Sequence, residues 1–356
     1  MRLEKLIKKI QPLGVEAFLF TNRNNIFYFS GYSGEGMLLV KGERRIIVTD
    51  FRYVVQAGKE APGCEVAEIG AKSYAQVLSE LLSDVKKAAF EEDELTVAEF
   101  ASIKAECTST DFVPTKRVGL DIRMIKEDGE IELLQNAMDA TQDALYKAYE
   151  TAAFGMKEET LCAELEYYLR KKYGATPAFD FIVASGENGA MPHAVTGATK
   201  FHAGDMITLD FGAKISRYNS DMTRTFSMGK PGKKMSDIYK IVQEAQTAAQ
   251  AALAPGKICR DIDKIARDII QSYGYGQYFG HGTGHGVGLN IHEEPRLNMK
   301  SETVLREGMV VTVEPGIYIP GLGGVRIENT CYITKDGYKS FFDASTDLNI
   351  IDGGEI

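Results

Sequence analysis

The chain has 356 residues and a mass of 39.2 kDa, a length that fits two domains of ordinary size. A composition of 44% hydrophobic and 26% charged residues excludes a wholly disordered chain, and no stretch reaches the ~18–20 uninterrupted apolar residues of a membrane span. The net charge of −9, from 41 basic and 50 acidic side chains, argues against a nucleic-acid-binding protein, which usually carries a basic surface.

The N-terminus and the cysteines indicate a cytoplasmic protein. The first fourteen residues, MRLEKLIKKIQPLG, spread their charges through an amphipathic pattern and lack the apolar segment of a secretion signal. The five cysteines are isolated and odd in number, so they form neither a CxxC pair nor the disulfide framework of a secreted domain. We expect them to be reduced and mostly buried.

The first third of the chain alternates short apolar runs with helical patterns. Helices are expected near residues 3–10, 51–60, 72–84 and 96–107, and strands at 16–20, 36–40, 45–49, 64–69 and 87–92. The second and third of these strands form a hairpin around the KGE turn. Strands interleaved with helices indicate an α/β domain with a mixed sheet.

A long helix is expected to open the second domain, because apolar residues recur at helical spacing from Ile131 to Ala148. We place the boundary within 117–130, where a strand-like pattern gives way to this helix, and divide the chain into domains 1–122 and 123–356. The later patterns predict helices at 158–173, 234–254 and 260–272, a Gly/His-rich loop at 280–292, and strands at 179–186, 206–212, 221–228, 309–319 and 324–334. The whole is an α/β (α+β) protein.

Two aspartates flank a predicted turn in the second domain. Asp210 and Asp221 lie on either side of a turn around 214–217, so in a symmetric antiparallel hairpin they would face each other with Cβ atoms about 5 Å apart. Facing like charges are destabilising and require a counter-charge, either a divalent cation or an arginine such as Arg217 or Arg224. The alternative is a pair of solvated turn residues.

Two glutamates follow strand-like residues further along the chain. Glu314 lies in VTVEPGIY and Glu328 in VRIENT, so both should emerge within a sheet. Buried carboxylates are costly unless they are paired or bound to a metal. The bend that Pro315 and the following glycine impose after Glu314 is suited to aiming its side chain. The alternative is an ion pair, such as Glu328 with Arg326.

A glycine-rich segment, GHGTGHGVGLNIHEEP, contains His285. Its glycines disfavour a helix, which excludes a zincin-type pairing of His281 with His285, and it lacks the register of a phosphate-binding loop. Four carboxylates and one imidazole give too many oxygen ligands for one tetrahedral zinc. They suit two adjacent divalent ions, roughly 3.5–4 Å apart, that share bridging carboxylates and a water.

Taken in chain order, these motifs resemble a known family. The segments LDFG, YNSDMTRT, HGTGHGVGLNIHEEP, TVEPGIYIPGLGG and GVRIENT are similar to the dinuclear metallopeptidases of the pita-bread fold, which include methionine aminopeptidase, aminopeptidase P and prolidase. They cover most of 175–335. VTDFRY at 48–53 resembles the N-terminal domain of creatinase, prolidase and aminopeptidase P, a domain that methionine aminopeptidase would lack. The resemblance implies a small creatinase-like α/β domain followed by a pita-bread catalytic domain.

The resemblance implies a set of five metal ligands. Asp210 would chelate one ion, Asp221 and Glu328 would bridge the two ions, and His285 and Glu314 would complete the other. This oxygen-rich ligation suits Mn²⁺, and Co²⁺ or Zn²⁺ would also bind.

The resemblance also implies residues that act on the substrate. His193 in MPHA and His292 in IHEEP match histidines that contact the substrate and the tetrahedral intermediate. His281 matches a histidine at the mouth of the site, and Arg326 an arginine beside the bridging glutamate. The alternatives are a packed loop residue for His193 and a rim residue without a catalytic role for His281. His202 matches no functional position and is expected to be structural.

Two positions depart from the family pattern without touching a ligand. Arg217 stands where relatives often have glycine, which would alter the turn between the two aspartates. Asn329 stands where an aspartate often follows the bridging glutamate, which would remove a negative charge near the metals and tune their affinity.

The activity that the resemblance implies is metal-dependent hydrolysis of the peptide bond before proline in a di- or oligopeptide. This is the reaction of a prolidase-like Xaa-Pro dipeptidase, with two metal ions activating a bridging water, Glu314 as proton shuttle and a homodimeric assembly. The alternatives are an aminopeptidase P that acts on longer Xaa-Pro-Yaa peptides, a metal-free creatinase, and a non-catalytic binding module on the same fold. The complete ligand set argues against the last two.

Arg296, in IHEEPRLN, bears on the choice between dipeptidase and aminopeptidase. A dipeptidase must recognise the carboxylate of the substrate's proline, for which the planar guanidinium fork is suited. Arg296 resembles the prolidase arginine with this role. The alternative is a rim residue paired with Glu293, Glu294 or another acid.

Overall fold

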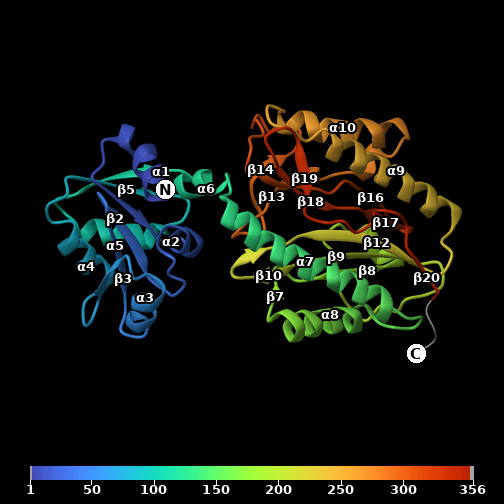
Figure 1. Cartoon of the computed structure of the whole chain (residues 1–356), viewed down its shortest axis with the longest axis horizontal. Helices are drawn as coiled ribbons and strands as arrows, with labels where there is room; N and C mark the ends of the chain where they lie inside the picture. Colours follow the sequence, from blue (N-terminus) through green and yellow to red (C-terminus); the bar gives the residue numbers. More distant parts are fainter. Residues whose placement is uncertain (1, 353–356) are drawn as a thin grey trace. The chain divides into compact units, whose positions relative to one another are not determined.

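The chain divides into two compact units, Met1–Arg123 and Met124–Ile356, and the computed structural model describes residues 2–352 (Figure 1). Both units combine helices with β-sheets, as the sequence predicted. None of the described helices is long and apolar enough to cross a membrane. All five cysteines are free, and three of them, Cys107, Cys259 and Cys331, are buried.

Unit 1 is built on a six-stranded mixed sheet in the order β4-β3-β2-β1-β5-β6. β2 runs antiparallel to β1 and β3, whereas the β1–β5, β5–β6 and β3–β4 pairs are parallel. The strands are β1 (Ala17–Phe20), β2 (Met37–Lys41), β3 (Arg44–Thr49), β4 (Glu65–Glu68), β5 (Lys87–Glu91) and β6 (Asp111–Thr115). The helices are α1 (Arg2–Ile10), α2 (Arg23–Ser30), α3 (Val54–Glu60), α4 (Tyr74–Leu81), α5 (Val97–Glu106) and α6 (Val118–Arg123).

The core of unit 1 follows the strand period of two. Leu19, Leu39, Ile46 and Val48 lie on one face of the sheet and pack with buried residues of α4 and α5 in one apolar cluster. Ser73 and Thr96 begin these two helices with capping boxes, which satisfy backbone N–H groups that have no partner within the helix.

Three elements of unit 1 were not predicted from the sequence. The strand-like pattern expected just after residue 117 is wrong, because α6 is a short helix in which the N–H of Asp121 donates to Arg117 O. Neither β6 nor α2 was anticipated. The signals for α2 were nonetheless present: Asn22 caps its N-terminus, and Gly31 ends it with a left-handed backbone (φ +86°).

Unit 2 contains two main sheets between two pairs of helices (Figure 1). The helices are α7 (Asp128–Thr151), α8 (Glu158–Tyr173), α9 (Lys233–Ala251) and α10 (Cys259–Ser272). A four-stranded sheet, in the order β20-β12-β9-β8, comprises β8 (Ile182–Ser185), β9 (Met206–Phe211), β12 (Met222–Met228) and β20 (Ile350–Ile351). A five-stranded sheet, in the order β14-β13-β15-β18-β19, comprises β13 (Gly284–Gly286), β14 (Glu293–Leu297), β15 (Val310–Val313), β18 (Asn329–Ile333) and β19 (Tyr338–Ser340).

Short strands complete unit 2. A three-stranded sheet contains β7 (Thr176–Pro177), β10 (Ala213–Ile215) and β11 (Tyr218–Asn219), and a two-stranded ribbon contains β16 (Gly316–Ile319) and β17 (Gly323–Arg326). The apolar faces of α9 and α10 pack on β15 and β18 in one cluster, which includes Val242, Ile262, Val311 and Ile333.

The two long strands expected at 309–319 and 324–334 are each interrupted, and the interruptions contain the glutamates of interest. β15 ends before Glu314 and β17 ends before Glu328. Pro315 cannot donate a ladder hydrogen bond, which ends β15. The freed N–H groups bond elsewhere: Glu314 N donates to Thr283 O (2.7 Å), and Glu328 N to Thr223 O (3.0 Å). The expected loop at 280–292 is also partly wrong, because Gly284–Gly286 forms β13.

Candidate active site

One cavity of about 640 Å³ in unit 2 brings together all the residues that the sequence analysis proposed for the site. These are Asp210, Asp221, His285, Glu314, Glu328, His193, His281, His292, Arg296 and Arg326. His202 does not line this cavity and lies in an exposed turn, where its ring is 3.4 Å from Asp205.

The aspartate hairpin differs from the expected one by two residues in register. Asp210 pairs with Thr223 and not with Asp221. The turn residues are Ser216 and Arg217, both with positive φ (48° and 72°), so the hairpin is centred one residue later than the sequence suggested. A shift of one residue in the turn centre moves every partner by two. Asp210 and Asp221 are therefore diagonal neighbours on one face of the hairpin.

The counter-charge for Asp210 comes from Arg326, neither from Arg217 nor from Arg224. The Arg326 guanidinium donates to Asp210 Oδ2 (2.7 Å) and to Thr223 Oγ1 (3.1 Å), and Thr223 Oγ1 in turn donates to Glu328 Oε2 (2.7 Å). The suggested ion pair of Glu328 with Arg326 is thus replaced by a contact through Thr223. One buried arginine orients two carboxylates.

Glu314 and His285 are held together by a second threonine. His285 N donates to Thr312 Oγ1 (3.0 Å), and this hydroxyl lies 3.2 Å from Glu314 Oε1 and donates to it. His285 Nε2 lies 3.2 Å from Glu314 Oε1 and 3.5 Å from Asp221 Oδ2. The ring's Nδ1 is 3.0 Å from Gly286 O, which can only accept a hydrogen bond, so Nε2 is the ring nitrogen that faces the carboxylates.

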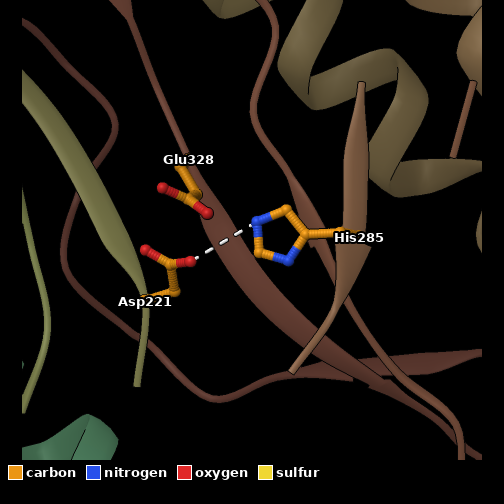
Figure 2. Close-up of side chains that lie close together, drawn as sticks. All are labelled: Asp221, His285 and Glu328. Carbon is orange, nitrogen blue, oxygen red and sulfur yellow. Dashed lines mark ion pairs between the residues drawn. The ribbon is translucent and has the colours of Figure 1, made fainter. Parts of the chain in front are cut away.

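The side chains of Asp221, His285 and Glu328 turn toward one another from three separate segments (Figure 2). One ligand atom from each lies within 4.8 Å of the others, and all three residues are buried. A ligating histidine commonly donates its other ring N–H to a backbone carbonyl, as His285 does here.

The hydrogen bonding of the carboxylates fits a bound cation. Asp210 Oδ1 and Glu328 Oε1 are buried and lack hydrogen-bond partners among the described residues, although the other oxygen of each group is bonded. A buried acceptor without a partner is costly, and a cation satisfies it. The two free oxygens and the cluster in Figure 2 together suit divalent metal ions.

The pKa values of the acidic residues also indicate that the cluster requires positive charge. Burial raises the pKa of Asp221 and of Glu328 well above the ordinary range, and repulsion between the neighbouring carboxylates adds to the shift. Burial also acts to raise the pKa of Glu314, but its hydrogen bond to His285 and the positive charges nearby outweigh this effect and lower that pKa to about 2. Positive charge at the centre of the cluster is what the carboxylates require.

The remaining residues form the rim of the cavity. The His292 ring packs edge-on against His285, with centroids 4.5 Å apart. Burial, together with the positive charges of His285 and Arg296, lowers the pKa of His292 to about 4. Among the described residues, no acidic side chain lies within ion-pair distance of the Arg296 guanidinium; Glu294 instead accepts from the backbone N–H of Arg296 (3.1 Å). His193 is exposed.

His281 is linked to Arg326 by a tyrosine that the sequence analysis missed. Its Nδ1 is 2.8 Å from Gly282 O and its Nε2 is 2.8 Å from the Tyr318 hydroxyl, which accepts from Arg326 (2.9 Å). Thr223 and Thr312 were also missed. A sequence signal existed for both threonines: each lies two residues from a proposed ligand, and therefore on the same face of its strand.

A buried cluster of carboxylates and one histidine that could hold divalent cations, at a cavity with further histidines, is typical of a metal-dependent hydrolase. The sequence matches metallopeptidase family M24 over residues 132–335 and the creatinase/prolidase N-terminal domain over residues 2–125. The chain belongs to metallopeptidase family M24, and divalent metal ions are the cofactor of this enzyme class.

Relatives match over nearly the whole length of the chain. An Xaa-Pro dipeptidase of Pyrococcus furiosus is 39% identical and covers 98% of this chain and 99% of its own. The structure of an Xaa-Pro dipeptidase from Bacillus anthracis superposes with a TM-score of 0.95 at 39% identity, covering 98% of this chain and 99% of the other. An X-Pro aminopeptidase from Thermotoga maritima superposes with a TM-score of 0.90 at 34% identity, covering 96% and 100%.

Proposed function

We propose that this metallopeptidase is a prolidase-like enzyme that hydrolyses Xaa-Pro dipeptides at the bond before proline. The relatives named as Xaa-Pro dipeptidases support the reaction. The observation that carries the choice of a dipeptide is the guanidinium of Arg296, which lines the cavity without an acidic partner among the described residues. A free C-terminal carboxylate would supply that partner through a bidentate pair of hydrogen bonds.

We assign the metal ligands as Asp210, Asp221, His285, Glu314 and Glu328. Asp221 and Glu328 would bridge two ions, for which Mn²⁺ suits the oxygen-rich set and Co²⁺ or Zn²⁺ would also bind. When bound, such ions supply a water nucleophile at neutral pH and polarise the carbonyl of the scissile bond. Thr223 and Thr312 orient the carboxylates before any ion arrives.

The other residues of the cavity would bind the substrate and move protons. Glu314 is ionised at neutral pH, because its pKa is about 2, and we assign it to carry the proton of the attacking water to the proline nitrogen. His292, whose pKa is about 4, is neutral at the same pH and can donate a hydrogen bond to the substrate oxygen without adding charge. His193 and His281 would hold the substrate at the rim, and Arg326 would keep Asp210 in place.

We further propose a homodimer located in the cytoplasm, with unit 1 shaping substrate access or a subunit contact. The experiment that tests the function compares wild-type cleavage of Ala-Pro, Ala-Pro-Gly and Ala-Ala after metal is added back to stripped enzyme. A dipeptidase cleaves Ala-Pro with the highest kcat/KM. A preference for Ala-Pro-Gly would instead identify an aminopeptidase, a second candidate supported by the likeness to the Thermotoga maritima structure.

A further inference from the structure

Lys126 and Glu293 form an ion pair deep inside unit 2. Lys126 Nζ lies 3.1 Å from Glu293 Oε2, and both side chains are 1% exposed. Removing two charges from water costs about as much as their attraction returns, so such a pair is weak evidence for a role in stability. A buried pair of this kind can instead fix the orientation of the two segments that carry it.

The lysine end of this pair is firmly held. Lys126 precedes α7 by two residues, and its backbone N–H donates to Gly308 O (2.8 Å). Gly308 has a positive φ of 83°, and a Cβ there would lie 2.9 Å from Ile125 Cγ2 and 3.1 Å from Lys126 O. The backbone at Gly308 therefore packs so closely against residues 125–126 that the backbone of Lys126 has little freedom to move.

The glutamate end holds the loop that precedes His292. Glu293 Oε1 accepts from Asn290 N (3.0 Å), and its carboxylate lies so close to Gly288 that a Cβ there would be 2.7 Å from Oε2. The same loop is fastened from its other side by Asn219, whose Nδ2 donates to Gly288 O (2.9 Å) and to Leu289 O (3.0 Å). The loop between these two anchors leads directly into His292.

We propose that Lys126 and Glu293 are positioning residues that act through the 288–292 loop to hold the His292 ring against His285. Lys126 fixes the Glu293 carboxylate, the carboxylate fixes the N–H of Asn290, and the loop then presents His292 to the cavity. This inference rests on the proposed function, because it assumes that His292 contacts the substrate.

Two double variants separate positioning from stability. In K126M/E293M an apolar pair of similar volume fills the space, but the acceptor for Asn290 N–H is lost. In K126Q/E293Q both charges are removed, but an amide oxygen remains to accept that hydrogen bond. The matched control is K233Q/D237N, which removes an exposed ion pair on α9 whose side chains are 89% and 49% exposed.

We expect K126M/E293M to keep its melting temperature and metal content while kcat on Ala-Pro falls at least about tenfold with little change in KM. Amide hydrogen exchange across 288–292 should accelerate at least about tenfold in the same variant. K126Q/E293Q should restore most of both properties, and K233Q/D237N should match wild type.

Wild-type exchange and wild-type kcat in K126M/E293M would overturn the proposal. Equal losses in both double variants, accompanied by a lower melting temperature, would also overturn it, because they indicate a purely structural pair. The exchange measurement does not depend on activity, so a wild-type enzyme that fails to cleave Ala-Pro would refute the proposed function and leave the positioning of the loop readable by itself.

Discussion

The inner and outer parts of the cavity are built in different ways. The inner residues Asp221, His285 and Glu328 are buried, and Asp210 and Glu314 have side chains only 15% and 17% exposed. Hydrogen bonds from threonines and from Arg326 orient this group. The outer residues are less constrained: His193 is exposed, and the Arg296 guanidinium has no acidic partner among the described residues.

The two groups differ because different segments carry them. The inner carboxylates lie at strand ends or at breaks between strands, and His285 lies within the short strand β13 between β14 and β15. Arg296 lies on β14, which is an edge strand, and His193 lies in an exposed loop. The groups assigned to the chemistry are thus held by the fold, whereas the groups assigned to substrate recognition stay available for a ligand.

The largest effect is expected from the inner group. Asp221→Asn should lower kcat/KM on Ala-Pro at least about a thousandfold, or about 4 kcal/mol of transition-state stabilisation, because the ligand that we propose to bridge the two ions would be lost. The metal-free variant should be at least as thermostable as metal-free wild type, because the pKa of Asp221 is raised by burial and a neutral amide removes that cost.

Kinetics, metal content and melting temperature measured on one preparation check this prediction. Asp237→Asn is the matched control, because Asp237 is an exposed acid on α9 paired with Lys233. Wild-type turnover with a full complement of metal in Asp221→Asn would show that the ligand assignment is wrong.

The outer group should affect substrate choice more than turnover. Arg296→Ala should raise KM for Ala-Pro by about 10–100-fold, since a charge-assisted hydrogen-bond pair contributes about 1.5–3 kcal/mol, and should change cleavage of Ala-Pro-Gly little. Arg296→Lys keeps the charge but loses the planar fork, so its KM for Ala-Pro should lie between those of wild type and Arg296→Ala. Equal losses on both peptides would remove Arg296 from the role of carboxylate clamp.

Metal removal should reveal the charge balance of the inner group. Because the folded-state pKa values of Asp221 and Glu328 lie above their unfolded values, the metal-free protein loses stability as the pH rises through those folded values. Bound divalent ions reverse this penalty, and they must first displace protons. Adding Mn²⁺ should therefore raise the melting temperature more at pH 8 than at pH 5.5. Equal increases at both pH values would contradict the raised pKa values of the two carboxylates.

The smallest effect concerns the turn between the two aspartates. Arg217 has φ +72°, a left-handed conformation that favours glycine, so Arg217→Gly should raise the free energy of unfolding by up to about 1 kcal/mol. Arg217→Ala keeps the unfavourable backbone and removes the side chain, so it separates the two contributions. Denaturant unfolding measures both variants, and a less stable glycine variant would show that the side-chain contacts of Arg217 dominate.

The sequence was informative where local patterns carry the signal. The mixed sheet of unit 1 and the helices of unit 2 follow from the periodicity of apolar residues, and the ligand candidates from motifs in chain order. The predicted register of the aspartate hairpin was wrong. The register depends on positive φ angles at Ser216 and Arg217, which neither serine nor arginine predicts.

Contacts between residues far apart in the sequence could not be predicted from local patterns. The pairing of Arg326 with Asp210 joins residues 116 apart, and Lys126 meets Glu293 across 167 positions. The breaks at Glu314 and Glu328 arise because their N–H groups bond to segments that no periodicity connects to them.

The most direct test of the account is a metal titration of stripped wild-type enzyme with Ala-Pro as substrate. Mn²⁺ should restore activity up to two ions per chain, with no further gain beyond that ratio, since we assign the four carboxylates and the histidine of the cavity as ligands of two ions. Full activity without added metal in the presence of a chelator, or a plateau at one ion per chain, would contradict the two-metal site.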